Sequence, residues 1–303
     1  MKLSQTTEEI FSVFGFGEGI DVMADAGFDA VDLAFYNLMC REEFSEDNAE
    51  KTCEKILRRV RNAGIRVNQA HAPFPSCRFL PDGSPDMEYC REAFARIIRS
   101  IRCAAQLGAG IIVVHPFETR DKRVQKEMNL DYYTKLEPFC RQYGIRIGIE
   151  NMYGTSMTDR SKLIPNVCSR GCELAEYVDS LPRGAFTACL DVGHAGLTGE
   201  SADEAVRVLG KERLGALHVH DTDFVRDLHT IPYQGRTDWE AFADAISDTG
   251  YAGDLTLEVL DGYFRPYRKN KELMRAALRL LAGTGRDLID RIEEKQQKKG
   301  TQR

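Results

Sequence analysis

The chain has 303 residues, of which 43% are apolar, and a formal net charge of −6 at pH 7. This length allows one large domain or two small ones, and the acidic balance makes nucleic acid an unlikely main partner. There is no apolar run of the roughly 20 residues that a membrane span needs, and no signal-peptide pattern. Nine cysteines without a CxxC pair indicate reduced thiols and a cytoplasmic location.

A helix-period segment, a glycine and a β-branched apolar run recur along the chain. Glycine often ends a helix in a left-handed conformation, so we expect each apolar run to be a strand. The expected strands lie near 10–15 and at 28–33, 65–71, 111–115, 145–150, 186–191, 214–220 and 254–259. The expected helices include 86–107, capped by Ser84, and those near 167–180, 202–210, 238–249 and 270–296.

Eight strand–helix units predict one closed (β/α)8 TIM barrel in a single domain. We expect the barrel to span 1–290 and a charged C-terminal tail to occupy 291–303. The alternative is an open doubly wound sheet. However, no glycine-rich phosphate loop follows the first strand, as cofactor-binding members of that fold require.

Ionisable side chains occur at the ends of six successive expected strands. They are His71, His115, Glu150, Asp191, His218 with His220, and Glu258, and His194 follows closely after Asp191. A single polar residue at a strand end is usually a cap or a solvated group. Six in succession predict convergence on the mouth of the barrel, because catalytic side chains of TIM barrels come from the carboxyl ends of the strands.

The last four of these strands supply a mixed set of oxygen and nitrogen donors. Two glutamates, an aspartate and an imidazole suit Mn²⁺, Mg²⁺, Co²⁺ or Fe²⁺, and Zn²⁺ is compatible with them. Four protein ligands on a six-coordinate ion leave two positions for water or substrate oxygens. This arrangement allows the ion to act as a Lewis acid.

Seven short motifs connect the chain to a known superfamily. They are His71-Ala72-Pro73-Phe74, Val114-His115-Pro116, Ile149-Glu150-Asn151-Met152, Leu190-Asp191-Val192-Gly193-His194, Leu217-His218-Val219-His220-Asp221, Asp227-Leu228-His229 and Leu257-Glu258-Val259. In these residues the chain resembles the xylose isomerase-like TIM-barrel superfamily. Its members include sugar phosphate isomerases/epimerases, ketose 3-epimerases, inosose dehydratases and endonuclease IV-type AP endonucleases.

The resemblance implies a role for each of these residues. The implied metal ligands are Glu150, Asp191, His218 and Glu258, of which Glu150 and Glu258 are also catalytic. One glutamate would remove the proton next to a metal-polarised carbonyl, and the other would reprotonate the enediolate. Asp221 would either support the metal-bound imidazole or cap a loop. The implied substrate-binding residues are His71, His115, His194, His220, His229 and Arg236, although His220 could equally cap its strand and Arg236 could lie on the surface.

The favoured interpretation is a sugar or sugar phosphate isomerase/epimerase that uses a divalent metal, Mn²⁺ first. Phe224 and Ser156 stand where ketose 3-epimerases usually carry an arginine and a second glutamate, which argues against a usual free-ketose epimerase. One alternative is a lyase, either a dehydratase or a deglycosidase, that acts on a keto-sugar or inosose.

The second alternative is a multi-zinc AP-site hydrolase like endonuclease IV. Its extra zinc ligands correspond to His71, His115, His194, Asp227 and His229, so Asp227 and His229 are additional metal candidates. No stripe of lysine and arginine with interleaved aromatic residues is evident in the sequence, so nucleic acid is the less favoured substrate. We therefore expect a small sugar-derived substrate and no membrane partner, and the sequence leaves a homo-oligomer open.

Overall fold

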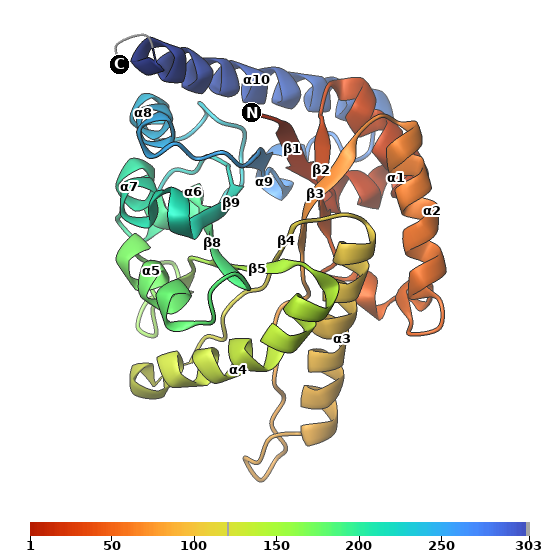
Figure 1. The fold of residues 1–303 in the computed structure, drawn as a ribbon, viewed down its shortest axis with the longest axis vertical. Coiled ribbons are helices and arrows are strands. Elements are labelled where there is room, and N and C mark those ends of the chain that lie inside the picture. Colours follow the sequence, from red (N-terminus) through yellow and green to blue (C-terminus); the bar gives the residue numbers. More distant parts are fainter. Residues whose placement is uncertain (120, 301–303) are drawn as a thin grey trace.

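The computed structural model describes residues 1–119 and 121–300. Eight parallel strands form a barrel with helices around it (Figure 1). The strands are β1 Leu3–Thr6, β2 Ala30–Ala34, β3 Arg66–His71, β4 Ile111–Val113, β5 Arg146–Glu150, β8 Phe186–Asp191, β9 Leu214–His218 and β10 Leu255–Leu257. Their order is β10-β1-β2-β3-β4-β5-β8-β9.

The two strands at the ends of this order, β10 and β9, come together and close the barrel. A parallel bridge joins Val219, directly after β9, to Leu257 of β10. The amide of Val219 donates to the carbonyl of Thr256 at 2.9 Å, and the amide of Glu258 donates to the carbonyl of Val219 at 3.0 Å. The predicted TIM barrel is therefore confirmed.

The helices follow the strands in the expected alternation, with two short insertions. The α-helices are α1 Glu8–Ala26, α2 Ala49–Asn62, α3 Met87–Gln106, α4 Lys122–Tyr143, α5 Gly171–Ser180, α6 Val192–Leu197, α7 Ala202–Arg213, α8 Trp239–Thr249, α9 Asp261–Phe264 and α10 Lys271–Gly300. Two 3-10 turns, η1 Leu38–Cys40 and η2 Glu42–Phe44, precede α2, and an antiparallel hairpin of β6 Tyr153–Thr155 and β7 Leu163–Pro165 follows β5.

Two local predictions are wrong. The segment 10–15 lies inside α1, and the first strand is Leu3–Thr6. All four side chains of β1 are buried although three of them are polar, so this strand lacks the apolar run by which the others were found. The cap of α3 is Asp86 rather than Ser84, because the Asp86 carboxylate accepts a hydrogen bond from the amide of Tyr89 at 3.1 Å.

The interior of the barrel has a polar side and an apolar side. Ser4 donates to Asn68 at 2.8 Å, and Asn68 donates to Thr256 at 2.9 Å. These residues lie on β1, β3 and β10, so their contacts cross the barrel interior. A small apolar cluster lies on strands β4, β8 and β9 and consists of Ile111, Val113, Cys189 and Ala216. The polar side extends to Gln69, which accepts from Thr256 at 3.2 Å.

The helix α10 continues through most of the segment expected as a charged tail. Ile292 is fully buried, Lys295 pairs with Asp244 of α8 at 2.8 Å, and Lys299 also pairs with a residue of α8, Asp248. Residues 301–303 lie outside the described part of the chain. Among the described residues, no helix combines the length and apolar character that crossing a lipid bilayer requires.

Candidate metal centre and active site

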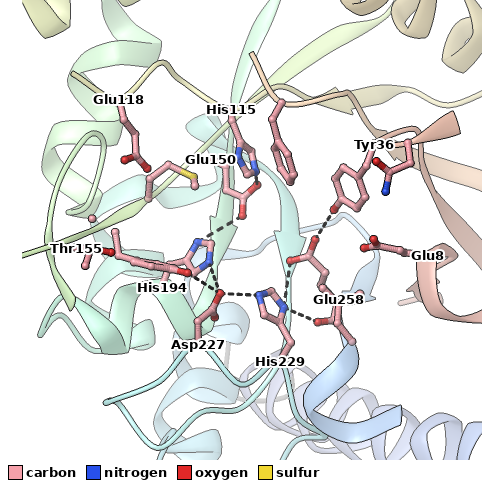
Figure 2. Close-up of a pocket in the computed structure, with 16 residues that line it drawn as sticks. Glu8, Tyr36, His115, Glu118, Glu150, Thr155, His194, Asp227, His229 and Glu258 are labelled. Carbon is pink, nitrogen blue, oxygen red and sulfur yellow. Dashed lines mark hydrogen bonds and ion pairs between the residues drawn. The ribbon is translucent and has the colours of Figure 1, made fainter. Parts of the chain in front are cut away.

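The six strand ends meet at the mouth of the barrel. His71, Glu150, Asp191 and His218 are the last residues of β3, β5, β8 and β9, while Glu258 follows β10 directly. All six histidines of the chain stand in ring contact with at least one other, with centroids between 3.8 and 6.1 Å apart. Figure 2 shows three of them, His115, His194 and His229, among the carboxylates that line the mouth.

Glu150 and Glu258 both approach the same ring nitrogen of His218. The Nδ1 atom of His218 is 3.2 Å from Oε1 of Glu150 and 3.3 Å from Oε2 of Glu258. Oε2 of Glu150 also lies 2.9 Å from Nε2 of His115 and 3.4 Å from Nε2 of His71. The Glu150 carboxylate therefore contacts histidines from both sides of the mouth, His71 at the end of β3, His115 after β4 and His218 at the end of β9.

The two glutamates differ in their affinity for a proton. Burial opposes ionisation of Glu150, but the charges of His218 and His115 outweigh it and hold the pKa of Glu150 well below its ordinary value. Burial raises the pKa of Glu258, and the nearby imidazoles only partly offset that effect. One carboxylate is thus held ionised while the other retains a proton more readily.

Asp191 is held from several directions. Its Oδ1 accepts from the amide of His194 at 2.6 Å, which caps α6, and Nε2 of His220 lies 3.0 Å from both oxygens. The Asn151 side chain bonds the backbone amide and carbonyl of Asp191 at 2.7 and 2.9 Å. Burial opposes ionisation of Asp191, but the charges of His194 and His220 lower its pKa to about 2.

A third carboxylate, Asp227, faces two imidazoles from the loop after β9. Its Oδ2 lies 3.1 Å from Nε2 of His229 and 3.7 Å from Nε2 of His194, and accepts from the Tyr153 hydroxyl at 3.0 Å. Burial opposes ionisation of Asp227, yet the charge of His229 and the contact with His194 hold its pKa well below the ordinary value. Asp227 in turn outweighs the burial of His229 and raises its pKa to about 9.

Backbone carbonyls orient three of the imidazole rings. The Nδ1 atoms of His71, His194 and His229 each lie 2.9 Å from the carbonyl oxygens of Ala72, Asn151 and Glu258, respectively. A proton on Nδ1 makes this hydrogen bond and leaves Nε2 free to accept or to bind a cation. Each Nε2 points toward the carboxylates of the mouth, as a set of metal ligands requires.

The donor set fits a divalent cation. Ligand atoms within 4.8 Å of one another connect Glu150 with His218, His218 with Glu258, and Glu258 with Asp191. Oε2 of Glu150 and both ring nitrogens of His218 are buried without a hydrogen-bond partner, and such buried polar atoms usually have one. Carboxylate oxygen and imidazole nitrogen are the donors that Mn²⁺, Co²⁺ and Zn²⁺ accept in proteins.

Three candidates from the sequence lie outside the mouth. His220 is fully buried and stacks on His229 with centroids 3.8 Å apart, behind the residues that line the cavity. The Asp221 carboxylate has no contact with His218. It accepts instead from Thr222, Gly235, Thr237 and Trp239 and so organises the loop after β9. Arg236 is exposed, over the ring of Phe224 at 5.8 Å.

Asp32 makes the imidazole contact that the sequence suggested for Asp221. It is fully buried on β2, and its Oδ2 lies 3.5 Å from Nε2 of His218. Asp32 was not predicted as a site residue, because it lies in the middle of β2 and not at the end of a strand. An acidic residue inside the apolar run 28–33 was the available indication, since an aspartate is seldom fully buried without a partner.

The mouth contains a cavity of about 420 Å³. Its wall is strongly acidic and consists of Glu8, Tyr36, Asn37, Phe74, His115, Glu118, Glu150, Met152, Tyr153, Gly154, Thr155, His194, Asp227, His229, Glu258 and Leu260. Among these described residues there are five carboxylates and neither lysine nor arginine. The Tyr36 hydroxyl donates to Oε1 of Glu258 at 3.0 Å (Figure 2), a contact that places an aromatic residue beside a candidate catalytic group.

Fold and site together define a class of protein, a TIM barrel with carboxylates and imidazoles at the strand ends that can hold a divalent cation. A family model described as a xylose isomerase-like TIM barrel matches residues 20–283. The chain therefore belongs to the xylose isomerase-like TIM-barrel family, and the predicted membership is confirmed.

Three similar proteins illustrate the family. The uncharacterized protein y4fM of Sinorhizobium fredii is 26% identical over 278 residues, which cover 82% of this chain and 83% of that protein. The D-psicose 3-epimerase of Ruminiclostridium cellulolyticum is 22% identical over 245 residues, 79% of this chain and 76% of that protein. A crystal structure of a D-psicose 3-epimerase in the presence of D-fructose matches with a TM-score of 0.72 at 19% identity and covers 95% of this chain and 99% of that chain. The structural match establishes the shared fold.

Proposed function

We propose that the protein is a divalent-metal-dependent sugar isomerase or epimerase in which Glu150 and Glu258 transfer a proton. The observation that carries the proposal is the pair itself. Both glutamates contact the same ring nitrogen of His218, and their surroundings shift their pKa values in opposite directions. Two carboxylates whose pKa values are shifted apart by their surroundings are suited to act as base and acid in one reaction.

The ligands proposed for the metal are Glu150, Asp191, His218 and Glu258, and Mn²⁺ is the favoured ion. When bound, the ion would polarise a substrate carbonyl and acidify the adjacent C–H bond. One of the two glutamates accepts the proton from that carbon, and the other returns a proton from its own side. The Tyr36 hydroxyl holds Oε1 of Glu258 in place by donating to it at 3.0 Å. Asp32 and the backbone carbonyls hold the rings in place.

The cavity suits a small polyol. Its five lining carboxylates can accept hydrogen bonds from hydroxyl groups. His194 presents Nε2 to the cavity because its Nδ1 is engaged by Asn151, so it can hold a substrate oxygen. A small sugar-derived substrate is therefore part of the proposal. A cytoplasmic location and a homo-oligomer stay predictions from the sequence.

A multi-metal hydrolase is the second candidate, and one observation favours it. His71, His115 and Glu150 form a further group of candidate ligands, and so do His194, His220, Asp227 and His229. Additional ions could therefore bind beside the first. The acidic wall of the cavity opposes a polyanionic DNA backbone, which favours the sugar enzyme. A lyase that acts on a keto-sugar or inosose would share the proton abstraction and differ only in the later step.

Isotope exchange and metal analysis test the proposal together. Mn²⁺-loaded protein incubated with a panel of ketoses, keto-sugars and their phosphates in D₂O should place deuterium on the carbon next to the carbonyl. Glu150→Gln and Glu258→Gln should each abolish turnover, while His220→Ala, which does not line the cavity, should leave residual activity. Full activity in both glutamate variants would refute the two-carboxylate mechanism. Three tightly held zinc ions per chain would instead favour the hydrolase.

A further inference from the structure

A second cavity of about 650 Å³ opens beside the first, and it has a different character. It is lined by Phe74, Pro75, Ser76, Cys77, Phe79, His115, Pro116, Phe117, Glu118, Thr119, Met128 and Met152. Seven of these twelve side chains are phenylalanine, proline or methionine. Four of the twelve, Phe74, His115, Glu118 and Met152, also line the acidic cavity. The two cavities therefore lie next to each other and share a wall.

The apolar side chains of the second cavity are exposed to an unusual degree. Phe74 is 55% exposed, Phe79 65% and Met128 37%. Large exposed apolar side chains that gather in one place mark binding sites. Phe74 and Phe79 lie on the long connection from β3 to α3, part of which extends away from the rest of the molecule in Figure 1, and Met128 lies on α4.

The connection that carries Phe79 is ordered by its own hydrogen bonds. The amide of Asp86 donates to the carbonyl of Arg78, and the amide of Leu80 donates to the carbonyl of Ser84, both at 2.8 Å. A bridge pairs Phe79 with Pro85. The exposure of Phe79 is therefore built into a defined turn.

Phe74 connects the apolar cavity to the proton-transfer groups. Its ring stacks on Tyr36 with centroids 5.0 Å apart and planes inclined by 21°, and it lies 4.8 Å from the ring of His115. Tyr36 bonds Glu258 and His115 contacts Glu150. A ligand that occupied both cavities would thus contact Phe74, which lies between the catalytic carboxylates and the apolar wall.

We propose that the second cavity binds an apolar substituent, aromatic or alkyl, that is attached to the sugar in the first. The substrate class is then a sugar derivative with an aglycone rather than a free sugar. This inference rests on the proposed function, because it takes the acidic cavity as the place of the sugar. Hydroxyl groups match the carboxylates of the first cavity, whereas the phenylalanine, proline and methionine side chains of the second favour an apolar group. Its concave form and the wall that it shares with the acidic cavity favour a substrate group over a second copy of the chain.

Matched glycosides test the inference with the full chain. We would measure equilibrium binding of methyl and phenyl β-glycosides of D-glucose, D-galactose and D-mannose by ligand-observed NMR and compare each pair. For the sugar that binds best, the phenyl glycoside should bind at least about tenfold more tightly than the methyl glycoside, because a phenyl ring removes substantial apolar surface from water. Phe79→Ser and Met128→Ser should each reduce this preference to below about threefold. The methyl glycoside should bind all variants alike.

Leu280→Ser is the matched control, because Leu280 is 59% exposed on α10 and does not line either cavity. Its phenyl preference should equal that of the wild-type protein. Equal affinity for both glycosides, or no binding of any phenyl glycoside, would overturn the inference. A wild-type dimer that Phe79→Ser converts to a monomer in light scattering would also overturn it, since a second copy would then cover the patch. Metal binding and deuterium exchange are separate readouts, so failure of the proposed function is recognised independently.

Discussion

The positions of Asp32 and Asp221 lead to opposite predictions for two isosteric substitutions. Asp32 lies 3.5 Å from Nε2 of His218 and is fully buried, so Asp32→Asn removes the charge that supports the imidazole. Loss of such a supporting partner usually weakens metal binding about 10- to 100-fold, or about 1.4–2.8 kcal/mol. We expect Asp32→Asn to weaken binding of Mn²⁺ by this factor.

Asp221→Asn should leave metal affinity nearly unchanged and destabilise the fold instead. Oδ1 of Asp221 accepts from Thr222 and Thr237, and Oδ2 accepts from Gly235 and Trp239. An asparagine has one oxygen, so either orientation of its amide leaves two N–H donors without an acceptor. At about 1–3 kcal/mol for each unsatisfied group, the free energy of unfolding should fall by roughly 2–6 kcal/mol.

Two assays separate these effects. Competition with a chromophoric chelator gives the Kd for Mn²⁺, and urea unfolding of the metal-free protein gives the free energy of unfolding. The wild-type protein and the two variants serve as controls for one another, because both changes replace one carboxylate oxygen by nitrogen. The reasoning would be refuted if Asp221→Asn weakened metal binding tenfold or more while Asp32→Asn did not.

Three further predictions concern protons, thiols and packing. Metal binding should release protons and weaken as pH falls. The proposed ligand His218 has its pKa raised well above the ordinary value despite its burial, by Cys189, Glu258 and Glu150, so in the metal-free protein it holds a proton at pH 7 that the ion must displace. Calorimetry in buffers of different ionisation enthalpy should show the release, and buffer-independent heats would contradict it. Diamide should oxidise Cys77 and Cys90, whose sulfur atoms lie 2.8 Å apart, to a disulfide. The reaction should be faster at pH 9 than at pH 7, because the contact with Cys90 raises the pKa of Cys77 to about 11 and the thiolate is the reactive form. Peptide mass spectrometry identifies the product, and a different major cross-link would contradict the geometry. Gly193→Ala should destabilise the protein by about 1–3 kcal/mol, because its Cβ would lie 2.0 Å from the ring of His220; an unchanged urea midpoint would argue against that packing.

The sequence predicted the fold and most of the site for one physical reason. In a parallel barrel the strand direction fixes which end of each strand reaches the mouth, so a residue such as Glu150 or Glu258 can be placed once its strand is recognised. Strands with apolar runs were recognised, and the set that ends in His71, Glu150, Asp191 and His218 followed. Strand β1 was not, because three of its four side chains are polar and it lacks an apolar run.

The roles of neighbouring acids could not be read in the same way. Asp221 stands three residues from His218 in sequence, yet its carboxylate turns toward the loop donors of Gly235 and Trp239. Asp32 is distant in the sequence and reaches His218 only because both lie inside the closed barrel. Of the two roles expected for Asp221, the structure shows the loop cap, and sequence proximity to His218 could not decide between them. Which acid meets an imidazole depends on how competing N–H donors are distributed in three dimensions.

The same electrostatic argument connects the separate features of the mouth. Glu150, Asp191 and Asp227 are kept ionised in a buried region, where a carboxylate needs positive charge close by. Without an ion this charge comes from the protons of the imidazoles, which is why the pKa values of His194 and His218 are raised well above the ordinary value although burial opposes it. A divalent cation replaces several of these protons at once and leaves the imidazoles neutral, as ligands must be. Proton release and metal affinity therefore measure the same interaction, and a variant that weakens one should reduce the other.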